Sequence, residues 1–438
     1  MSAEGAARAG LRRAKIIDLT HDGEGVADLD GERAFVAGAL PGETVELELK
    51  KRRRGHREAE LVRIVEPSPE RIAPPCEYFG RCGGCALQHL ADAAQLRFKQ
   101  RAVEQAFARI AHVAPDEWLA PITGPTFGYR RRARLGAKFV RGKDRVLVGF
   151  RERASPYITD MARCPVLASP IDSLLGELAE VIGKSSVRER LPQIEVAVGD
   201  AAAALVLRVL DPPSAADEAS FRDLGERHGV DIYLQRGGPG TVTPLTEPPR
   251  ELSYRLPQFD VTLKFAPTDF VQVNAAVNEQ MVAAAVELAD VRGSDRVLDL
   301  FCGLGNFSLP FARRAAEVVG VEGEAGLVAR AVRNAAANGI ANTRFLTADL
   351  AQTGWPFYRE HWDIVVLDPP RTGAEAPVAD MRGVAPRRVV YVSCHPATLA
   401  RDARVLVSEL GFRLAAARVL DMFPQTHHVE AMALFVRD

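Results

Sequence analysis

The stretch VLDLFCGLGNFSLPF, residues 297–311, reads as a strand, a glycine-containing turn and the start of a helix. Gly303 and Gly305 allow the backbone of the turn to approach a ligand closely. The spacing is G-x-G and lacks the third glycine that is typical of dinucleotide-binding folds. Asp299 lies within the strand, just before the turn. The stretch therefore predicts a ligand-binding turn at the end of a buried strand.

Three further strands end in a carboxylate. VVGVE ends in Glu322, TRFLTAD ends in Asp349, and IVVLDPP places Asp368 at its end. Ligands of parallel sheets bind at the C-terminal ends of the strands. Glu322 is placed to hold two ribose hydroxyls, and Asp349 could accept a hydrogen bond from an adenine amine. Acidic strand ends disfavour a nucleotide phosphate, and the pattern resembles a class I methyltransferase that uses S-adenosyl-L-methionine (SAM).

The region from about residue 266 to residue 415 alternates strand and helix patterns regularly, which predicts βαβ units and a parallel sheet. The last two strands, ARVLDMF (417–423) and VEAMALFVR (429–437), can pair antiparallel across residues 424–428. The expected fold class is therefore α/β, with a Rossmann-like, doubly wound sheet that ends in an antiparallel hairpin.

The composition is that of a globular protein, with 47% hydrophobic and 26% charged residues among 438. No apolar run is long enough for a membrane span, and the N-terminus has no apolar signal core, so we expect a cytoplasmic protein.

The net charge is −1, but the charges are distributed unevenly along the chain. Residues 1–170 hold 29 Lys and Arg against 22 Asp and Glu, and the rest hold 27 against 35. The first part could face a polyanion.

The N-terminal region supports this interpretation. Residues 10–67 contain four short strand patterns separated by Gly and Pro, which suits a small OB-like β-barrel. KKRRRGHR, residues 50–57, is predicted to lie in a loop of that barrel, where it could bind phosphates. YRRRARL, residues 129–135, is a second basic stretch beside an aromatic residue.

Cys394 follows the apolar run 389–392 and precedes His395-Pro396, so it is expected where a strand meets a loop. Methylation of uracil at C5 requires a cysteine thiolate to add at C6, which makes C5 nucleophilic. It also requires a base to remove the C5 proton afterwards. Cys394 and Glu430, which opens the last strand, are the candidates. An inert buried thiol is the alternative for Cys394.

Other methyl-transfer chemistries leave different marks in the segment Asp368-Pro369-Pro370-Arg371. RNA cytosine-C5 enzymes usually carry a cysteine directly after the first proline, and adenine-N6 enzymes carry an aromatic residue after the prolines. Neither is present here, so uracil C5 is the favoured target.

A cluster of cysteines lies in CEYFGRCGGC, residues 76–85, which has the spacing C-x5-C-x2-C. Cys164, far downstream, could supply a fourth thiolate. Four thiolates suit either tetrahedral zinc or an iron–sulfur cluster, and the spacing does not separate the two. A radical SAM enzyme would instead need the spacing C-x3-C-x2-C.

The motifs YVSCHPATLARD, LDLFCGLGNFSLP, VLDPPRTG, FVQVN and DMFPQTHHVEAM resemble those of the RNA uracil-5-methyltransferase family, over nearly the whole chain. The resemblance implies a nucleophile at Cys394 and a base at Glu430. It implies a SAM site whose residues are Gln272, Phe301, Asn306, Glu322, Asp349 and Asp368. It also implies a [4Fe–4S] cluster whose ligands are Cys76, Cys82, Cys85 and Cys164. One departure is Asp349, where a close relative carries Asn, and either side chain can accept from an adenine amine.

The resemblance further implies three domains: an RNA-binding TRAM barrel (10–67), a central α+β iron–sulfur domain (75–90 and 125–265) and the methyltransferase domain (91–124 and 266–438). The implied substrate is 23S rRNA, and we expect a monomer. The T-loop of tRNA is the alternative substrate, although the tRNA enzyme usually lacks the barrel and the cysteine cluster. A non-catalytic RNA-binding protein is the alternative from another class, against which the presence of Cys394, Asp368 and Glu430 argues.

Overall fold

The chain forms two compact units in the computed structural model, which describes residues 11–53 and 56–437. Unit 1 comprises residues 1–98, 152–155 and 424–427, and unit 2 comprises residues 99–151, 156–423 and 428–438. No helix in the described ranges is long and apolar enough to cross a membrane.

Unit 1 contains a closed five-stranded barrel with the strand order β1-β2-β3-β5-β4. Its strands are β1 (Leu11–Leu19), β2 (Gly25–Leu29), β3 (Glu32–Val36), β4 (Thr44–Arg53) and β5 (His56–Glu66). Small and branched apolar side chains fill its interior: Ala14, Ile16, Ala27, Ala34, Val36, Val45, Leu47 and Ala59. The predicted barrel is confirmed, although the sequence patterns gave four strands and missed β2.

The prediction that the basic run 50–57 forms a loop was wrong. The antiparallel ladder between β4 and β5 continues past Leu49 after a register shift, and it pairs Arg52 with Arg57 and Arg53 with His56. The backbone of the run therefore belongs to a long hairpin. Arg54 and Gly55 lie outside the described residues.

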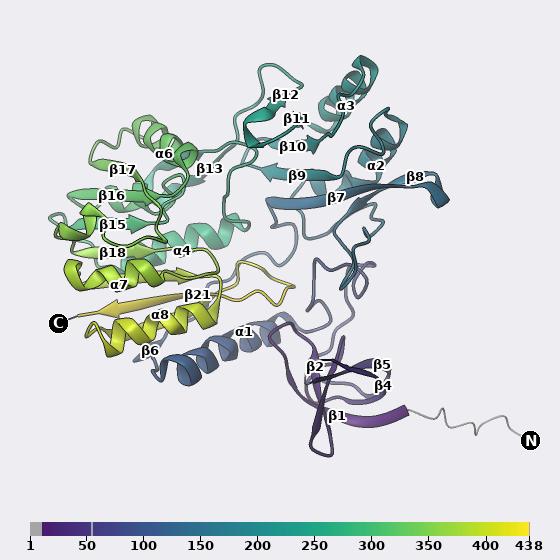
Figure 1. Cartoon of the computed structure of the whole chain (residues 1–438), viewed down its shortest axis with the longest axis horizontal. Coiled ribbons are helices and arrows are strands. Elements are labelled where there is room, and N and C mark those ends of the chain that lie inside the picture. Colours follow the sequence, from purple (N-terminus) through teal and green to yellow (C-terminus); the bar gives the residue numbers. More distant parts are fainter. Residues whose placement is uncertain (1–10, 54–55, 438) are drawn as a thin grey trace, which may run out of the picture. The chain divides into compact units, whose positions relative to one another are not determined.

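Unit 2 is organised around an eight-stranded sheet with the order β17-β16-β15-β18-β19-β21-β20-β6 (Figure 1). The strands are β6 (Glu117–Trp118), β15 (Arg296–Leu300), β16 (Glu317–Glu322), β17 (Thr343–Thr347), β18 (Ile364–Leu367), β19 (Arg388–Ser393), β20 (Arg413–Leu420) and β21 (Glu430–Val436). Strands β15 to β19 run parallel, whereas β21 is antiparallel to both β19 and β20. The predicted doubly wound sheet with a terminal antiparallel hairpin is confirmed.

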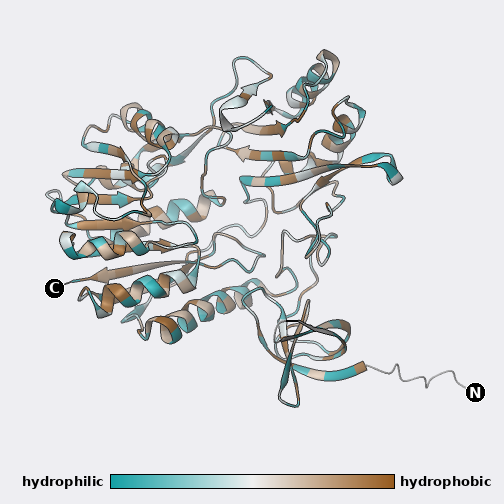
Figure 2. Ribbon diagram, in the orientation of Figure 1, coloured by the Kyte–Doolittle hydropathy of each residue, from teal (hydrophilic) through white to brown (hydrophobic). Residues whose placement is uncertain are grey.

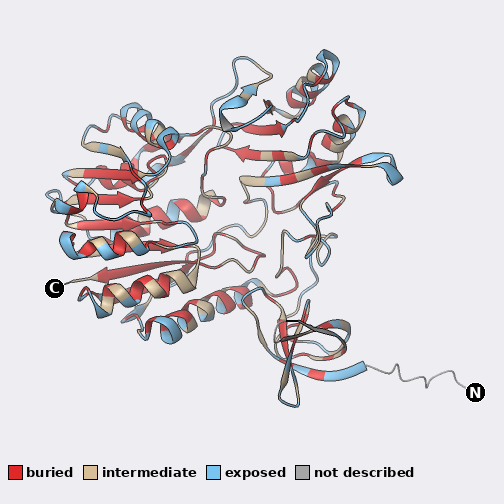
Figure 3. Cartoon of the chain, viewed as in Figure 1, coloured by how far each residue is buried: buried red, intermediate tan, exposed pale blue. Residues whose placement is uncertain are grey.

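Helices cover both faces of this sheet. They are α1 (Asp92–Ala106), α4 (Ala275–Leu288), α5 (Ser308–Ala312), α6 (Ala325–Ala337), α7 (Glu375–Val384) and α8 (Pro396–Ser408), and a π-helical turn (Phe107–Ala111) continues α1. Alternate strand residues such as Leu298, Val365 and Tyr391 join α7, α8 and the C-terminal part of α1 in one core. Parallel crossovers are right-handed, so α5 and α6, which connect β15, β16 and β17, lie on the other face. The inner strands β15, β18, β19 and β21 are accordingly apolar and mostly buried, whereas β17 at the sheet edge has no fully buried residue (Figures 2 and 3).

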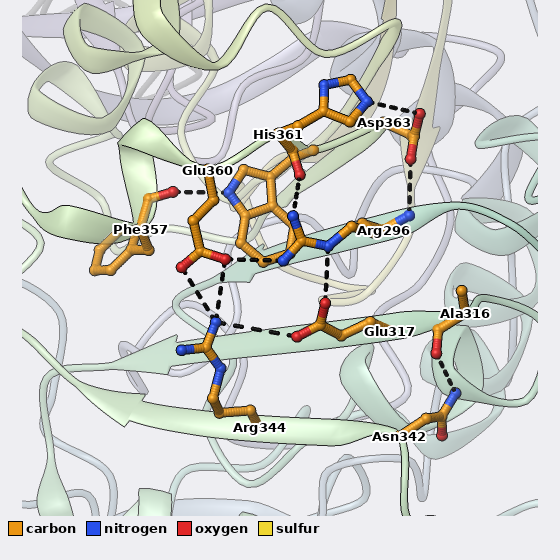
Figure 4. Close-up of polar contacts among 10 residues, drawn as sticks. Arg296, Ala316, Glu317, Asn342, Arg344, Phe357, Glu360, His361 and Asp363 are labelled. Atoms are coloured by element: carbon orange, nitrogen blue, oxygen red, sulfur yellow. Dashed lines mark hydrogen bonds and ion pairs between the residues drawn. The ribbon is translucent and has the colours of Figure 1, made fainter.

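The amino-terminal edge of the sheet carries a network of charged side chains around Arg296 (Figure 4). Arg296 donates to Glu317 and Glu360 at 2.8 Å each, and its guanidinium lies 4.4 Å from the centre of the Trp362 ring. Arg344 bonds the same Glu360 at 3.2 Å. The positive and negative side chains of this network pair with one another, and they link the first residues of the strands to the segment that follows the 3₁₀ turn Pro356–Arg359. The amino-terminal edge therefore contributes to stability. The candidate reactive groups lie at the opposite, carboxyl-terminal edge.

Unit 2 also contains a second sheet with the order β12-β11-β10-β9-β7-β8 and a separate β13–β14 hairpin. Their strands are β7 (Arg132–Val140), β8 (Arg145–Gly149), β9 (Gln193–Val198), β10 (Ala203–Arg208), β11 (Val230–Gln235), β12 (Val242–Pro244), β13 (Ser253–Leu256) and β14 (Val261–Lys264). Helices α2 (Leu175–Lys184) and α3 (Ala215–His228) accompany the second sheet.

The basic stretch 129–135 begins this second sheet, and its charges have internal partners. Arg131 bonds Asp200 at 2.5 Å, Arg134 bonds Glu195 at 3.1 Å, and Arg132 donates to the carbonyl of Val196 at 3.1 Å. The Tyr129 side chain is buried. The stretch therefore contributes to the packing of unit 2 rather than presenting a row of free cations.

Candidate active site

The glycine turn after β15 is held by the carboxylate that ends β16. The Gly303 N–H donates to Glu322 Oε2 at 3.2 Å, and the Glu324 N–H donates to Oε1 at 3.1 Å. Phe301 opens the turn with a φ of 65°, a conformation that residues with a side chain rarely adopt. Such strain is typical of functional loops. Glu322 remains half-buried with lone pairs left for a ligand.

Asn306, at the end of the turn, is fixed by two side chains that the sequence gave no reason to select. The Tyr254 hydroxyl donates to Asn306 Oδ1 at 2.9 Å, and Asn278 of α4 exchanges two hydrogen bonds with the same amide, at 2.9 and 3.1 Å. The Asn306 side chain therefore ties the turn to α4 and β13. These three hydrogen bonds fix the orientation of the Asn306 amide.

Asp299 of β15 and Asp368, which follows β18, are carboxyl groups near the carboxyl-terminal edge of the sheet. Burial raises the pKa of each to about 7, against the hydrogen bonds that Ser308 donates to Asp299 at 2.5 Å and Gln272 donates to Asp368 at 3.3 Å. Asp299 Oδ1 has no hydrogen-bond partner among the described residues. Gln272 and Asp368 are thus brought together, as members of one site must be.

Asp349 follows β17 and is exposed. It accepts hydrogen bonds from the Ala351 N–H and from the Gln352 side chain, both at 3.0 Å. These bonds fix the carboxylate in a tight turn at the same edge of the sheet.

Cys394 lies between β19 and α8 and is half-buried. The helix begins with Pro396, and the preceding His395 caps it by accepting a hydrogen bond from the Thr398 N–H at 3.4 Å. The cysteine therefore occupies a fixed turn at a helix N-terminus. Burial raises the pKa of its thiol, Glu430 and Asp368 raise it further, and the positive charge of Arg371 opposes them.

Glu430 is the first residue of β21 and is 3% exposed. The ladder between β19 and β21 pairs Ser393 with Ala431. In an antiparallel pair the next positions are Cys394 and Glu430, so the two side chains come from adjacent strand ends. Burial raises the pKa of Glu430 to about 8, the carboxyl of Asp368 adds to this rise, and Lys99 opposes it.

This arrangement places a thiol and a buried carboxyl together at the edge where the cofactor turn lies. A family model described as tRNA (Uracil-5-)-methyltransferase matches residues 92–438, and a TRAM domain model matches residues 11–62. The chain belongs to the tRNA (uracil-5-)-methyltransferase family. The resemblance to RNA uracil-5-methyltransferases is thereby confirmed.

Two members of this family are similar along nearly their whole length. The 23S rRNA (uracil(1939)-C(5))-methyltransferase RlmD of Stenotrophomonas maltophilia (strain K279a) is 48% identical over 426 residues, which cover 96% of each chain. The protein of that name from Alkalilimnicola ehrlichii is 50% identical and covers 97% of this chain and 96% of its own. The crystal structure of Pyrococcus abyssi tRNA (uracil-54, C5)-methyltransferase with S-adenosyl-L-homocysteine matches with a TM-score of 0.74 and 26% identity. It covers 97% of this chain and 100% of its own.

Two cysteines lie at the carboxyl edge of the sheet, Cys302 and Cys394. Cys302 is 3% exposed, and burial raises the pKa of its thiol well above the ordinary value. Cys394 is the more exposed of the two and is the one beside Glu430. Of these two cysteines, Cys394 is therefore the better candidate for a reactive thiol.

Besides Asn278 and Tyr254, two further residues near the candidate site could not be selected from the sequence, Lys99 and Arg371. Lys99 is a lysine within α1 whose side chain is entirely buried. Arg371 was noted only as the residue after the prolines, and it contacts His428 Nδ1 at 2.7 Å. A lysine on an amphipathic helix is expected to face solvent, so nothing in the sequence distinguished Lys99.

The predicted cysteine cluster is not assembled as a metal site. The described residues contain no group of three or more His, Cys, Asp or Glu side chains arranged to hold a metal ion. All six cysteines are free of disulfides. The chemistry of the loop nevertheless suits thiolate ligands, since the Gly84 N–H donates to Cys82 Sγ at 3.3 Å. His89, whose ring centre lies 5.1 Å from that of Phe79 in the same loop, is buried with no hydrogen-bond partner for either ring nitrogen among the described residues.

Proposed function

We propose that this protein transfers a methyl group from SAM to C5 of a uracil in 23S rRNA. The observation that carries the proposal is the juxtaposition of Cys394 and Glu430 at neighbouring strand ends, beside Asp368 and the glycine turn. A nucleophile and a base on one edge are what this chemistry requires.

The residues of the carboxyl edge fit SAM. It is cationic at its sulfonium, and the edge carries carboxyl groups from three strand ends: Glu322, Asp349 and Asp368. Glu322 would hold the ribose hydroxyls, and Asp349 the adenine amine. Gln272, Phe301 and Asn306 would complete the site through the Asp368 contact and the shape of the turn. When bound, SAM supplies an electrophilic methyl group.

Cys394 performs the first step. Its sulfur adds to C6 of the uracil as a thiolate, and the electron pair of the C5–C6 double bond moves toward C5 and the O4 carbonyl. Burial and two carboxyl groups raise the pKa of the thiol, so its proton must be lost to solvent before the sulfur adds. The positive charge of Arg371 is the influence that favours the thiolate. C5 would then accept the methyl group that bound SAM supplies, and S-adenosyl-L-homocysteine would leave.

Glu430 performs the last step. It removes the proton from the methylated C5, the C5–C6 double bond re-forms, and the bond between C6 and the Cys394 sulfur breaks. Only the carboxylate form can accept this proton. Because burial places its pKa at about 8, release should become faster as the pH rises toward 8.

The choice between rRNA and tRNA rests on sequence identity. The two rRNA-modifying relatives are 48% and 50% identical to this chain, and the tRNA-modifying protein of known structure is 26% identical. That tRNA-modifying protein covers 97% of this chain, so the presence of the N-terminal region does not separate the two substrates as the sequence analysis supposed.

The remaining parts of the proposal concern the barrel and the cysteines. The TRAM barrel, with its basic β4–β5 hairpin, would contact RNA phosphates. Cys76, Cys82, Cys85 and Cys164 would hold a [4Fe–4S] cluster. The cysteine spacing and the N–H that Gly84 donates to Cys82 Sγ support this part. Methyl transfer moves no net electrons, so the cluster would be structural.

Incubation with methyl-labelled SAM tests the proposal. Unmodified 23S rRNA and unmodified tRNA transcripts are offered separately, and nuclease digests are analysed for 5-methyluridine. Label should appear in 5-methyluridine from 23S rRNA, and Cys394→Ala should give none. Label confined to tRNA would replace the rRNA assignment, and label in another nucleoside would refute the chemistry.

A further inference from the structure

Lys99 is a buried lysine with two hydrogen-bond partners on the segment that leads from β20 to Glu430. Its ammonium donates to Asp421 Oδ1 at 2.6 Å and to the carbonyl of Phe423 at 2.9 Å. Its side chain has no exposed surface, and that of Asp421 is 8% exposed. The ammonium group and its ion-pair partner therefore lie inside unit 2.

The anchored segment begins beside the cross-strand partner of Glu430. The β20–β21 ladder pairs Leu420 with Glu430, and Asp421 is the residue after Leu420. The Asp421 N–H donates to the carbonyl of Ile122 at 2.9 Å. Lys99 therefore holds the side chain of Asp421, one residue after the cross-strand partner of Glu430, and the backbone of Phe423 two residues further on.

The groups around Glu430 are mostly acidic. Asp368 faces it from the end of β18, Cys394 from the end of β19, and Asp421 follows β20, while Arg371 acts on Cys394 from the loop after β18. Lys99, from α1, is the cation that opposes the rise in the pKa of Glu430. Its charge therefore favours the form of Glu430 that can accept a proton.

Stability gives little reason to keep such a pair. Burying two charges costs several kcal/mol of desolvation, and apolar residues of similar volume often serve a fold equally well. A function near Glu430 explains the pair better than folding does.

We propose that Lys99 is the positioning residue for Glu430: it anchors the mouth of the β20–β21 hairpin and supplies the buried positive charge that favours the carboxylate of the base. This inference rests on the proposed role of Glu430. Lys99 does not touch the substrate, and it acts through Asp421 and through its electric field.

The test measures how fast the covalent protein–RNA adduct releases its product, in single turnovers between pH 6 and pH 9.5. Lys99→Met removes the charge at similar volume, and Lys99→Arg restores a cation. The double variant K99M/D421N avoids leaving a buried, unpaired carboxylate, and so guards against misfolding. Arg387→Met is the matched control, because Arg387 pairs with buried Asp295 at 2.5 Å at the amino-terminal edge of the sheet.

In the parent enzyme the rate of release should rise toward about pH 8. In K99M this rise should move to higher pH, and in the double variant it should move by less, because the negative charge of Asp421 is removed as well; each pH unit of displacement makes release about tenfold slower at pH 7. Lys99→Arg should have a pH profile of release close to that of the parent enzyme, and Arg387→Met should not shift that profile. A rate that falls equally at every pH would refute the inference, because a merely structural role would do that.

A parallel experiment with Glu430→Gln distinguishes failure of the proposed function from failure of the inference about Lys99. If E430Q releases product with the parent's pH profile, Glu430 is not the base, and both the proposed chemistry and this inference fall. If E430Q is blocked but the pH profile of K99M matches that of the parent, only the inference about Lys99 falls.

Discussion

Replacing Glu430 with Gln should make the protein more stable, by an amount that depends on pH. Burial raises the pKa of Glu430 from its ordinary value of 4.5 to about 8. A group whose pKa is raised in the folded state stabilises fully below its unfolded pKa, and loses that stabilisation as the pH rises through the folded pKa. Gln has the same shape and does not titrate, so E430Q escapes this loss.

The size of the effect follows from the difference of about 3.5 pH units. At about 1.4 kcal/mol for each unit, the carboxylate costs roughly 5 kcal/mol above pH 8. The advantage of E430Q in free energy of unfolding should be about 1 kcal/mol at pH 5.5, about 3 kcal/mol at pH 7.0 and about 5 kcal/mol at pH 8.5.

Urea unfolding followed by tryptophan fluorescence is a suitable assay, because all three tryptophans (118, 355 and 362) lie in unit 2 together with Glu430. Glu279→Gln, which removes one carboxyl group at an exposed position of α4, is the matched control. If the advantage of E430Q is the same at all three pH values, the carboxyl is not held in the environment described here.

Three further predictions concern the other parts of the proposal. Cys394→Ala should abolish methylation and leave the SAM dissociation constant within about twofold in equilibrium dialysis, since the thiol does not hold the cofactor; substantial turnover by this variant would remove Cys394 from the mechanism. Protein purified without oxygen should be brown and hold about four irons per chain, and Cys82→Ala should lower that content; colourless protein with one zinc would exclude the iron–sulfur cluster. Replacing the arginines at positions 52–54 with Gln should weaken rRNA binding and flatten its salt dependence, because fewer counterions are released; an unchanged slope in filter binding would mean that the run makes no phosphate contact.

The candidate site could largely be predicted from the sequence where a residue marks the end of a strand. Glu322, Asp368, Cys394 and Glu430 each close or open an apolar run, and parallel strands bring their carboxyl ends to one edge. The alternation of apolar runs with turn residues is enough to place these four residues at strand ends. The terminal hairpin followed from the same kind of pattern.

The residues that support the site could not be predicted in this way. Asn278 and Tyr254 reach Asn306 from α4 and β13, and Lys99 reaches Asp421 across 322 positions of sequence. These contacts depend on how helices and strands pack, and local patterns do not encode that packing. The same limit applies to the basic stretch 129–135, whose partners Asp200 and Glu195 lie far along the chain.

The central claim is that Cys394 and Glu430 perform two separate steps of one methyl transfer. It is tested most directly by incubating E430Q with 23S rRNA and methyl-labelled SAM, followed by denaturing gel electrophoresis. If addition at C6 and methyl transfer proceed while proton removal is blocked, the label should stay with a covalent protein–RNA adduct, and C394A/E430Q should form none. Free methylated RNA at the parent's rate, with no adduct, would contradict the account.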